Sequence, residues 1–548
     1  MNKPLKLDFN ERCDNNNPII SDFTDGELFW QYPERQPLEA RIAELNNLNK
    51  NQVLCTNGGD EAIMILMRII KESEQLILPL PAFSQYTWGV ESWGLDALLV
   101  KPKDNLAIDL KETRKAIKYS ASTVTIVTRP NNPTGEMIEE RELIKLINTS
   151  QENNGWVFLD EAYIEFSNTG IDAADLLSKF DNLVILRTLS KAFGLAGIRI
   201  GYLLGCEKLI AKFRLRCMPF NISTPSLQIA TRALEDSNLE DVENYCQQIR
   251  FNRQFITDWL QSQDIEVFPS QANFIFLKLA KGRAKAIRSF FKKNNILVRT
   301  FEEAQMTNCL RITIPYNIEK LFKLLKQCLI PKLICMDMDG VLIDTSNSYD
   351  LCVLATVESF SGKKISIDTI KKLRAQGGFN NDWLLSQQLL KNLGYSCGIQ
   401  EVTDVFQKCY LGEASDGLVK NELPLISSEF VEVIQELDIC QFAIVTGRPK
   451  QEAKTGRTLC NLTELDLVSL DDVKTGKPSP EGIQSLQQKY SYSSWMCGDN
   501  PDDMQAAVGS NSLAVGIGLD QADALYDAGA DIVIESINDL KEWMKNDK

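Results

Sequence analysis

Short apolar runs alternate with helical patterns from residue 76 onward, and this alternation constrains the fold more than any other feature of the chain. The runs are LILPLPAF, ALLV, TVTIVT, WVFLDEAY and NLVILRTLS. Strands that alternate with helical segments are typical of α/β architecture with a mainly parallel sheet. We therefore predict an α/β fold for this part of the chain.

Polar clusters follow three of these runs at the point where each strand is expected to end. TVTIVT runs into RPNNPTGE, WVFL runs into Asp160-Glu161-Ala162-Tyr163, and NLVILRTL runs into Ser190-Lys191. Open α/β sheets bind their ligands at the carboxyl ends of the strands. The three clusters therefore predict one ligand site at this edge of the sheet.

The stretch TLSKAFGLAGIRIG, residues 188–201, indicates what that ligand is. Lys191 sits in a turn of small and hydroxyl residues, and Arg199 follows eight residues later. A lysine can condense with an aldehyde, while hydroxyl groups and an arginine hold a phosphate. Pyridoxal phosphate is the common cofactor that is both an aldehyde and a phosphate monoester. The alternative is that residues 188–201 form an ordinary loop with no bound cofactor. The residues of the other two clusters have to distinguish between these interpretations.

A second candidate phosphate site is the helix start in CTNGGDEAIMILMRII. Gly58 and Gly59 open this helix, and Asp60 and Glu61 occupy its first turn. Free backbone N–H groups and the helix dipole favour a phosphate there. A plain helix start with acidic first-turn residues explains the same pattern.

The remaining strand-end residues each have a use beside a pyridine ring. Asp160 would keep the ring nitrogen protonated, so that the ring acts as an electron sink. Asn132 and Tyr163 would hydrogen-bond the ring oxygen, and Phe83 would stack on the ring face. The structural alternatives are a turn at NNPTG, a helix cap at Asp160 and a core aromatic at Phe83.

Taken together, residues 5–330 resemble the fold-type I pyridoxal-phosphate aminotransferases, and within them the histidinol-phosphate aminotransferase branch. The motifs that carry the resemblance are YPE, GGDE, PNNPTGE, DEAYIEF, SKAFGLAGIRIGY and ANF. The resemblance implies that Lys191 binds the cofactor and moves the α-proton, with Asp160 at the pyridine nitrogen. It implies a cofactor-binding set of Gly59, Asp60, Glu61, Phe83, Asn132, Asp160, Tyr163, Ser190 and Arg199.

The same resemblance implies a homodimer and a substrate clamp. Tyr32 would reach the cofactor phosphate of the neighbouring subunit, while Arg299 and Arg311 match the family's substrate arginines. Such guanidinium groups suit the carboxylate of an amino donor or the phosphate of a substrate. The segment FNERCDNNNP at residues 9–18 departs from the family's usual NENP, so the match supports aminotransferase chemistry more directly than the choice of substrate.

A new apolar strand, KLICM, begins after Ile330-Pro331 and runs into two carboxylates, Asp337 and Asp339. Carboxylates two residues apart at a strand end can both approach Mg²⁺. Asp337 would attack phosphorus, and Asp339 would protonate the leaving oxygen. A lone DxD is also common in surface turns.

Three later features, in a fixed order, strengthen the phosphate chemistry. Strand FAIVT ends in Thr446-Gly447-Arg448, which offers a hydroxyl for phosphate binding, and Lys477 can neutralise charge during transfer. SWMC then runs into the acidic segment GDNPDD at residues 498–503. These positions hold the groups that phosphate-ester hydrolysis needs.

This order resembles the haloacid-dehalogenase superfamily over residues 331–548, and the presence of Asp339 fits its phosphatase branch. By the match, Asp337 and Asp499 bind Mg²⁺ together with the backbone carbonyl of Asp339. Asp503 supports the site, and Asp502 is expected at the surface. The predicted fold of this part is Rossmann-like, with a helical cap at about residues 346–430 like that of phosphoglycolate phosphatases. Gly377-Gly378 would face the substrate there, unless the pair merely ends a helix.

Composition narrows the function classes. A chain of 548 residues predicts more than one domain, and we expect the boundary between 330 and 331. A net charge of −15 and the lack of a long apolar run argue against nucleic acid and membranes as partners. Fourteen scattered cysteines favour reduced thiols in a cytoplasmic protein. The absence of histidine excludes Ser-His-Asp triads and His-liganded zinc.

The sequence therefore predicts a bifunctional enzyme with pyridoxal phosphate and Mg²⁺ as cofactors. Histidinol phosphate would be the product of the first half and the substrate of the second, with glutamate and 2-oxoglutarate as the other pair. A chain without histidine could also be made during histidine starvation. Three alternatives stay open. The first is an aminotransferase for another, aromatic amino acid with a phosphoglycolate-type phosphatase, the second an O-phospho-amino-acid decarboxylase, and the third a chain in which one half has become a docking module.

Overall fold

The computed structural model describes residues 5–6, 32–120, 123–169, 172–379, 381–412, 416–437 and 440–544. The segment at residues 9–18 that departs from the aminotransferase pattern lies outside these ranges. The chain forms two compact units. Unit 1 comprises Met1–Leu279 and Asn295–Ile318, and unit 2 comprises Ala280–Asn294 and Glu319–Lys548.

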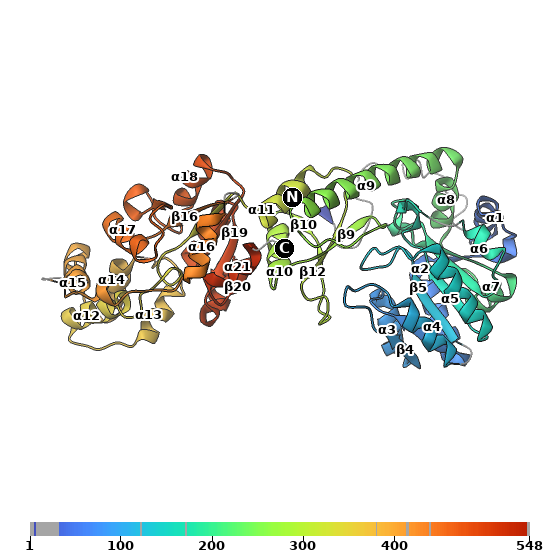
Figure 1. Ribbon diagram of the computed structural model, residues 1–548, viewed down its shortest axis with the longest axis horizontal. Helices are drawn as coiled ribbons and strands as arrows, with labels where there is room; N and C mark the ends of the chain where they lie inside the picture. Colours follow the sequence, from blue (N-terminus) through green and yellow to red (C-terminus); the bar gives the residue numbers. More distant parts are fainter. Residues whose placement is uncertain are drawn as a thin grey trace. The chain divides into compact units, whose positions relative to one another are not determined.

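The centre of unit 1 is a seven-stranded sheet (Figure 1). The two pairs that β8 makes, with β2 and with β7, are antiparallel and the other four pairs are parallel, so the prediction of a mainly parallel sheet is confirmed. In sheet order, the strands are β2 (Val53–Asn57), β8 (Ile200–Gly205), β7 (Leu183–Thr188), β6 (Trp156–Asp160), β5 (Thr123–Thr128), β3 (Gln75–Pro79) and β4 (Ala97–Val100).

The inner strands of this sheet are apolar because helices cover both of their faces. Every residue of β5 and β6 is buried, as in parallel sheets enclosed on two sides. One core cluster joins the sheet to α2, α3 and α7. The helices of unit 1 are α1 (Gln36–Leu45), α2 (Gly58–Ser73), α3 (Ser84–Trp93), α4 (Leu110–Lys118), α5 (Glu140–Glu152), α6 (Ala173–Leu177), α7 (Glu207–Arg214), α8 (Thr224–Ala233) and α9 (Asp236–Ser262).

Sheet order and register bring the predicted polar clusters together. Strands β5, β6 and β7 are neighbours, with Thr128 opposite Asp160 and Asp160 opposite Leu186. The turns that follow these strands therefore begin side by side. This arrangement places the three sequence clusters at one edge of the sheet.

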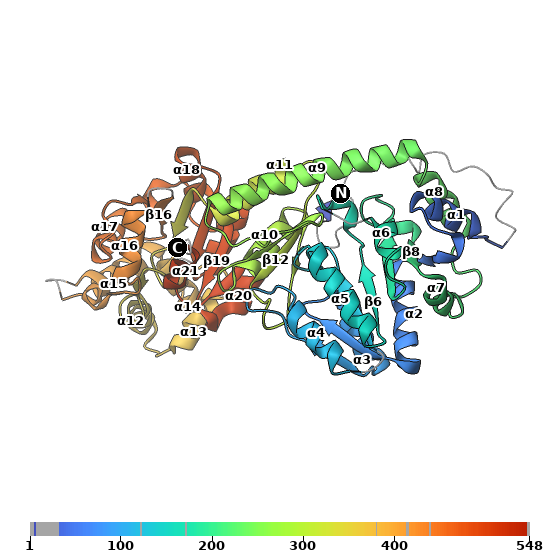
Figure 2. The same ribbon diagram turned by 45° about the vertical axis from the view of Figure 1, so that its right-hand side comes forward.

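Two small sheets complete unit 1. The antiparallel sheet β11-β12-β9 carries Arg299 opposite Arg311, and β1 pairs with β10 in parallel. Figure 2 shows α9 as one long helix that begins beside α8. The strands are β1 (Leu5–Lys6), β9 (Phe274–Lys278), β10 (Ile296–Leu297), β11 (Arg299–Thr300) and β12 (Cys309–Thr313).

Unit 2 is built on a six-stranded sheet that is parallel throughout. Strand β13, which leads into Asp337, lies in the middle between β16 and β18. In sheet order the strands are β17 (Asp466–Val468), β16 (Gln441–Val445), β13 (Leu333–Met336), β18 (Ser494–Gly498), β19 (Leu513–Ile517) and β20 (Ile532–Ile534). The helices around it are α16 (Ser428–Glu436), α17 (Lys450–Leu459), α18 (Glu481–Lys489), α19 (Pro501–Gly509), α20 (Ala522–Asp527) and α21 (Leu540–Met544).

Four helices interrupt unit 2 after β13, and we call them the helical insertion. They pack around their own core, and a short antiparallel pair, β14 with β15, leads the chain in and out. A separate core of this size lets the insertion fold as one compact body. These elements are β14 (Ile343–Asp344), α12 (Tyr349–Ser361), α13 (Ile367–Arg374), α14 (Asp382–Asn392), α15 (Ile399–Leu411) and β15 (Leu423–Pro424).

Two helices that precede residue 330, α10 (Arg283–Lys293) and α11 (Glu319–Leu329), also belong to unit 2. Arg283 is buried and donates hydrogen bonds to the backbone carbonyls of Cys328, Leu329 and Trp543. Its guanidinium carbon lies 5.7 Å from the Trp495 ring centroid and 5.9 Å from that of Trp543. Burial lowers the pKa of Arg283 to about 10. The two helices are therefore part of the packed interior of unit 2.

Candidate active sites

A pocket of about 530 Å³ opens at the carboxyl edge of the unit 1 sheet. Its size is in the range of small-molecule sites. It is lined by eleven of the residues predicted for the cofactor and substrate: Gly59, Asp60, Phe83, Asn132, Asp160, Tyr163, Ser190, Lys191, Arg199, Arg299 and Arg311.

Asp160 ends β6 and is buried in the pocket wall. Its Oδ2 accepts a hydrogen bond from Tyr86 Oη (2.7 Å), and its Oδ1 accepts one from the Ala162 N–H (3.0 Å). Burial raises the pKa of Asp160 to about 6, while these two donors hold it down. The contact of Tyr86 could not be predicted from the sequence, because Tyr86 lies on α3 and its neighbours in the chain are those of an ordinary helix residue. A buried carboxylate fixed in this way suits a protonated pyridine nitrogen.

A chain of polar contacts lies near the cofactor lysine. Arg311 Nη1 donates to Asn132 Oδ1, and Asn132 Nδ2 donates to Tyr163 Oη (3.4 Å). Lys191 Nζ lies 5.6 Å from the centroid of the Tyr163 ring. Phe83, which also lines the pocket, meets Tyr86 edge to face. The residues predicted for the ring oxygen thus lie in contact with a predicted substrate arginine.

The N-terminus of α2 forms one end of the pocket, which Gly59 and Asp60 line. Arg199 is in the left-handed region (φ +56°), and its Nη2 lies 2.7 Å from Asp60 Oδ2. Gly58 has φ +74°, and a Cβ there would lie 2.4 Å from Arg199 Nη2. Ser190 Oγ accepts a hydrogen bond from Thr188. Backbone N–H groups, an arginine and hydroxyls in one cradle fit a phosphate monoester.

Two predicted cofactor residues do not line this pocket. Glu61 accepts hydrogen bonds from the Asn57 N–H (2.5 Å) and from Asn221 Nδ2 (2.6 Å), so it ties down the start of its own helix. Tyr32 is 78% exposed and stacks on Phe220 at 4.4 Å. The pocket within this subunit is therefore built without either side chain.

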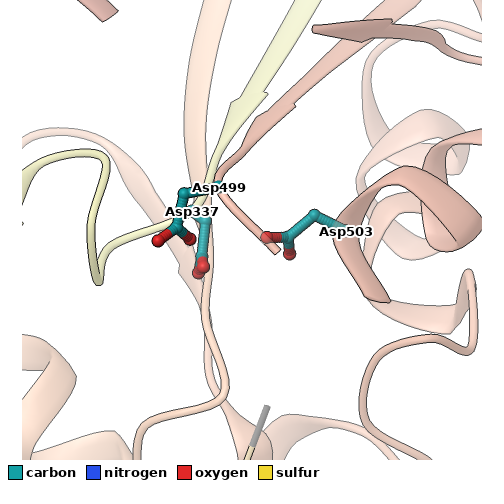
Figure 3. A group of neighbouring side chains, drawn as sticks. All are labelled: Asp337, Asp499 and Asp503. Atoms are coloured by element: carbon teal, nitrogen blue, oxygen red, sulfur yellow. The ribbon is translucent and has the colours of Figure 1, made fainter. Parts of the chain in front are cut away.

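The second site is a group of three carboxylates at the carboxyl ends of the unit 2 strands. Asp337 follows β13, Asp499 follows the neighbouring β18, and Asp503 projects from α19 toward both (Figure 3). Ligand oxygens of all three lie within 4.8 Å of one another. Lys477 Nζ lies 2.7 Å from Asp337 Oδ1 and 2.5 Å from Asp503 Oδ1. One lysine thus bridges two of the three carboxylates.

The electrostatics of this group fit a divalent cation. Burial and the other carboxylates raise the pKa of Asp499 to about 8 and that of Asp337 well above its usual range. Burial lowers the pKa of Lys477, but Asp337 and Asp503 outweigh this and raise it. Close carboxylates that resist ionisation are stabilised by a cation, and oxygen donors of this kind suit Mg²⁺.

Close packing holds the loop after β13 against the carboxylate group. Gly340 has φ +70°, and a Cβ there would lie 2.0 Å from Asp499 Oδ2. Asp339, one residue earlier, is not part of the three-carboxylate group, and its Oδ1 accepts a hydrogen bond from Arg448 Nε. Thr446 Oγ1 accepts the Arg448 N–H (3.2 Å), and Gly447 lines a cavity of about 20 Å³ next to Asp339. The sequence named Arg448 only as the last residue of the Thr446-Gly447-Arg448 motif. It did not predict the ion pair of Arg448 with Asp339.

The expectation that Asp502 lies at the surface is wrong. Asp502 is 1% exposed, and its Oδ1 accepts a hydrogen bond from the Gly378 N–H (2.7 Å). The loop of the helical insertion that contains Gly378 covers the start of α19, where Asp502 lies. The acidic segment at residues 498–503 does not by itself predict this contact. Gly377 and Gly378, both with positive φ, therefore contact the core of unit 2 beside the carboxylate group.

Comparisons with known proteins match both halves. Residues 9–326 match the family described as aminotransferase class I and II, and residues 331–511 match the haloacid dehalogenase-like hydrolases. A histidinol-phosphate aminotransferase from Thermoanaerobacter sp. (strain X514) is 33% identical over 285 residues, which are 52% of this chain and 78% of the relative. One from Serratia proteamaculans is 33% identical over 309 residues, 55% of this chain and 83% of the relative.

Solved structures share the fold of unit 1. The histidinol-phosphate aminotransferase from Clostridium acetobutylicum superposes with a TM-score of 0.53 at 21% identity, covering 58% of this chain and 97% of that one. The Sinorhizobium meliloti enzyme in complex with pyridoxal-5′-phosphate gives 0.51 at 22%, covering 59% and 89%. The two family matches show that the chain combines two enzyme domains. It belongs to the class I and II aminotransferases, and residues 331–511 form a haloacid dehalogenase-like hydrolase domain.

Proposed function

We propose that the chain interconverts histidinol phosphate and imidazole acetol phosphate, with glutamate and 2-oxoglutarate as the second pair, and also hydrolyses a phosphate monoester. One observation carries the proposal. Relatives named for histidinol phosphate match the first half over 78–83% of their length, and the same chain continues into a hydrolase. Histidinol phosphate would then be made at one site and dephosphorylated at the other.

At the first site, Lys191 would hold the cofactor and move the proton at the substrate α-carbon. Pyridoxal phosphate supplies an electron sink when bound. Asp160 would keep the pyridine nitrogen protonated, and Asn132 and Tyr163 would bind the ring oxygen. Phe83 would cover the ring face. The phosphate would be held by Gly59, Asp60, Ser190 and Arg199.

The two arginines of the antiparallel sheet would hold the substrate. Arg299 and Arg311 lie opposite each other in the β11–β12 pair, and both line the pocket. Arg311 is buried and already bonded to Asn132, whereas Arg299 is exposed. Guanidinium groups bind both carboxylates and phosphates in a bidentate manner, so the pair would take either the amino donor or the phosphate ester.

At the second site, Asp337 would attack phosphorus while Asp339 gives and takes the proton. Lys477, already paired with Asp337, would offset negative charge on the phosphoryl group. Asp337, Asp499 and the backbone carbonyl of Asp339 would bind Mg²⁺, with Asp503 in support. Thr446 and Gly447 would bind the phosphate.

We assign the aminotransferase to residues 1–330, the hydrolase to 331–548, and a substrate-enclosing cap to the helical insertion at about 346–430. The hydrogen bond from the Gly378 N–H to Asp502 supports the cap, because it places an insertion loop beside the carboxylate group. A cap that closes over the site favours small phosphorylated metabolites.

The proposed partner is a second copy of the chain. Tyr32 and Phe220 form an exposed aromatic pair, and Leu215 and Met218 nearby in sequence are 81% and 70% exposed. An apolar surface of this kind is typical of protein interfaces. In such a homodimer Tyr32 would approach the partner's cofactor phosphate.

Small molecules, and neither nucleic acid nor membrane, are the other proposed partners. In the described residues, no helix is both long and apolar enough to cross a membrane. The formal charge of −15 would repel polyanions. The proposed location is the cytoplasm.

A growth test and a substrate panel decide the assignment. We expect the gene to restore growth on histidine-free medium to strains that lack either histidinol-phosphate aminotransferase or histidinol phosphatase. Purified enzyme should prefer histidinol phosphate to phenylalanine and aspartate as amino donor to 2-oxoglutarate. Failure to rescue, with activity on phenylalanine, would move the first half to aromatic amino acids. Release of carbon dioxide without keto acid would indicate a decarboxylase.

A further inference from the structure

Arg448 lies at the centre of a buried charge network beside the carboxylate group. Its side chain is 1% exposed, and its Nε donates to Asp339 Oδ1 at 2.7 Å, with Nη2 2.6 Å from the same oxygen. On its other side, Nη1 and Nη2 donate to the two oxygens of Glu422, each at 3.0 Å. A guanidinium held by two carboxylates in a fork has one well-defined orientation.

Glu422 is itself anchored where the helical insertion joins the core. It directly precedes β15, which pairs with β14, so it stands at the return of the chain from the insertion. Its Oε1 also accepts hydrogen bonds from Ser348 Oγ (3.1 Å) and Tyr410 Oη (3.0 Å). The Arg448 guanidinium carbon lies 4.8 Å from the Tyr349 ring centroid. Side chains from α12, α15 and the β15 end thus fix the arginine.

We propose that Arg448 is a positioning residue for Asp339 and that Glu422 holds Arg448 in place. The inference rests on the proposed role of Asp339 as acid and base. Both contacts from Arg448 fall on Oδ1, so Oδ2 is the oxygen that exchanges the proton. The Asp339 side chain is 32% exposed, whereas that of Arg448 is 1% exposed. Arg448 therefore contacts Asp339 from its buried side and leaves its exposed side open to the substrate.

This role is consistent with both steps of the reaction. First, an Asp337 oxygen bonds to phosphorus, the phosphorus–ester oxygen bond breaks, and the proton of Asp339 Oδ2 passes to the departing alcohol. Then a water oxygen bonds to phosphorus, its proton returns to Oδ2, and the bond from phosphorus to Asp337 breaks to release phosphate. Arg448 can hold Oδ1 throughout, because a guanidinium N–H donates to the carbonyl oxygen of an acid as well as to a carboxylate.

The experiment compares two leaving groups in the full-length enzyme with Mg²⁺. Benzyl alcohol needs a proton as it departs, whereas p-nitrophenolate leaves readily without one. In Arg448→Ala, single-turnover cleavage of benzyl phosphate should fall about 10²- to 10³-fold, and release of p-nitrophenolate should fall less than about tenfold. Millimolar guanidinium should restore benzyl phosphate cleavage in Arg448→Ala but not in Asp339→Asn. Equal losses on both esters, or no loss, would overturn the proposal.

Arg283→Ala is the matched control, because it removes a buried arginine of unit 2 whose hydrogen-bond partners are the backbone carbonyls of Cys328, Leu329 and Trp543 and not Asp339. It should change both esters by the same factor. If Arg448→Ala does not fold, Arg448→Ala/Glu422→Gln removes the stranded carboxylate and must show the same split. Wild-type enzyme inactive on every ester would refute the proposed hydrolysis itself, whereas an active wild type with an unsplit variant refutes only the role of Arg448.

Discussion

The two candidate sites lie at the same structural position, the carboxyl edge of a parallel sheet, yet they are built in opposite ways. The unit 1 pocket measures about 530 Å³, and Lys191 and Asp160 enter its wall from the ends of two neighbouring strands. In unit 2 the cavity beside Asp339 measures about 20 Å³, and Lys477 and Arg448 are each bonded to two carboxylates. A site that holds a large organic cofactor needs space, whereas a site that holds a cation and a phosphoryl group needs concentrated charge.

The largest expected effect tests whether the two sites are independent at all. Lys191→Ala should lower transamination by about 10⁴-fold, because this lysine both holds the cofactor and moves the proton. The visible absorption band of the bound cofactor should vanish with it. Phosphatase activity, measured on the same sample, should be unchanged. A parallel loss of phosphate release would break the comparison.

Asp337→Asn is the reciprocal change and should be of similar size. An amide does not replace a carboxylate as the group that attacks phosphorus, so single-turnover hydrolysis should fall by about 10⁴-fold or more. Transamination and the cofactor spectrum serve as the internal control. Residual phosphatase activity near the wild-type level would show that another group is the nucleophile.

A smaller effect is expected from Tyr86, which bonds to Asp160 in the unit 1 pocket. Tyr86→Phe removes a donor to the ionised form of Asp160, so the pKa of Asp160 should rise further above about 6. A hydrogen bond to a charged group is worth roughly 1.5–3 kcal/mol, which corresponds to about one to two pH units. The acid limb of the transamination rate should move to higher pH by that amount. An unchanged pH profile would contradict the role given to Tyr86.

The smallest expected effect is the change with pH in the stability of unit 2, which contains the group of Asp337, Asp499 and Asp503. Asp499 has a folded-state pKa of about 8, above its unfolded value, so the folded state binds the extra proton between these two pH values. Without metal, stability should therefore fall as pH rises toward about 8, by at most about 1.4 kcal/mol per pH unit for each such carboxylate. Mg²⁺ should raise the melting temperature more at pH 8 than at pH 6. Equal shifts at both pH values would argue against these carboxylates as the metal site.

The fold, and the position of most candidate-site residues, could be predicted because these residues lie at the ends of strands, where the sequence pattern is clear. Asp160 ends the buried strand β6 and Lys191 follows its neighbour β7, so the order of the unit 1 sheet brings these two to one edge. Asp337 likewise follows the buried strand β13 of the unit 2 sheet. Tyr86, Glu422 and the burial of Asp502 could not be predicted, because each depends on a contact between segments distant in sequence. Tyr86 reaches Asp160 across 74 positions, and Gly378 reaches Asp502 across 124.

Glu61 was expected beside the cofactor because of its motif, but it does not line the pocket. It carries a family motif and lies next to Asp60, yet its carboxylate turns back to cap the start of α2 and to bind Asn221. Position in a motif did not determine the direction of the side chain. Hydrogen-bond competition at the helix terminus did so, because the Asn57 N–H needs an acceptor there.

Helix α10 has a consequence for how such a chain could arise or be taken apart. It falls within the range that matches the aminotransferases, yet its Arg283 lies against Trp495 and Trp543 in unit 2. A gene cut at the codon for Pro331 would encode a hydrolase with both tryptophans stripped of this cover. A hydrolase that is stable on its own would therefore need other side chains to cover Trp495 and Trp543 in place of α10.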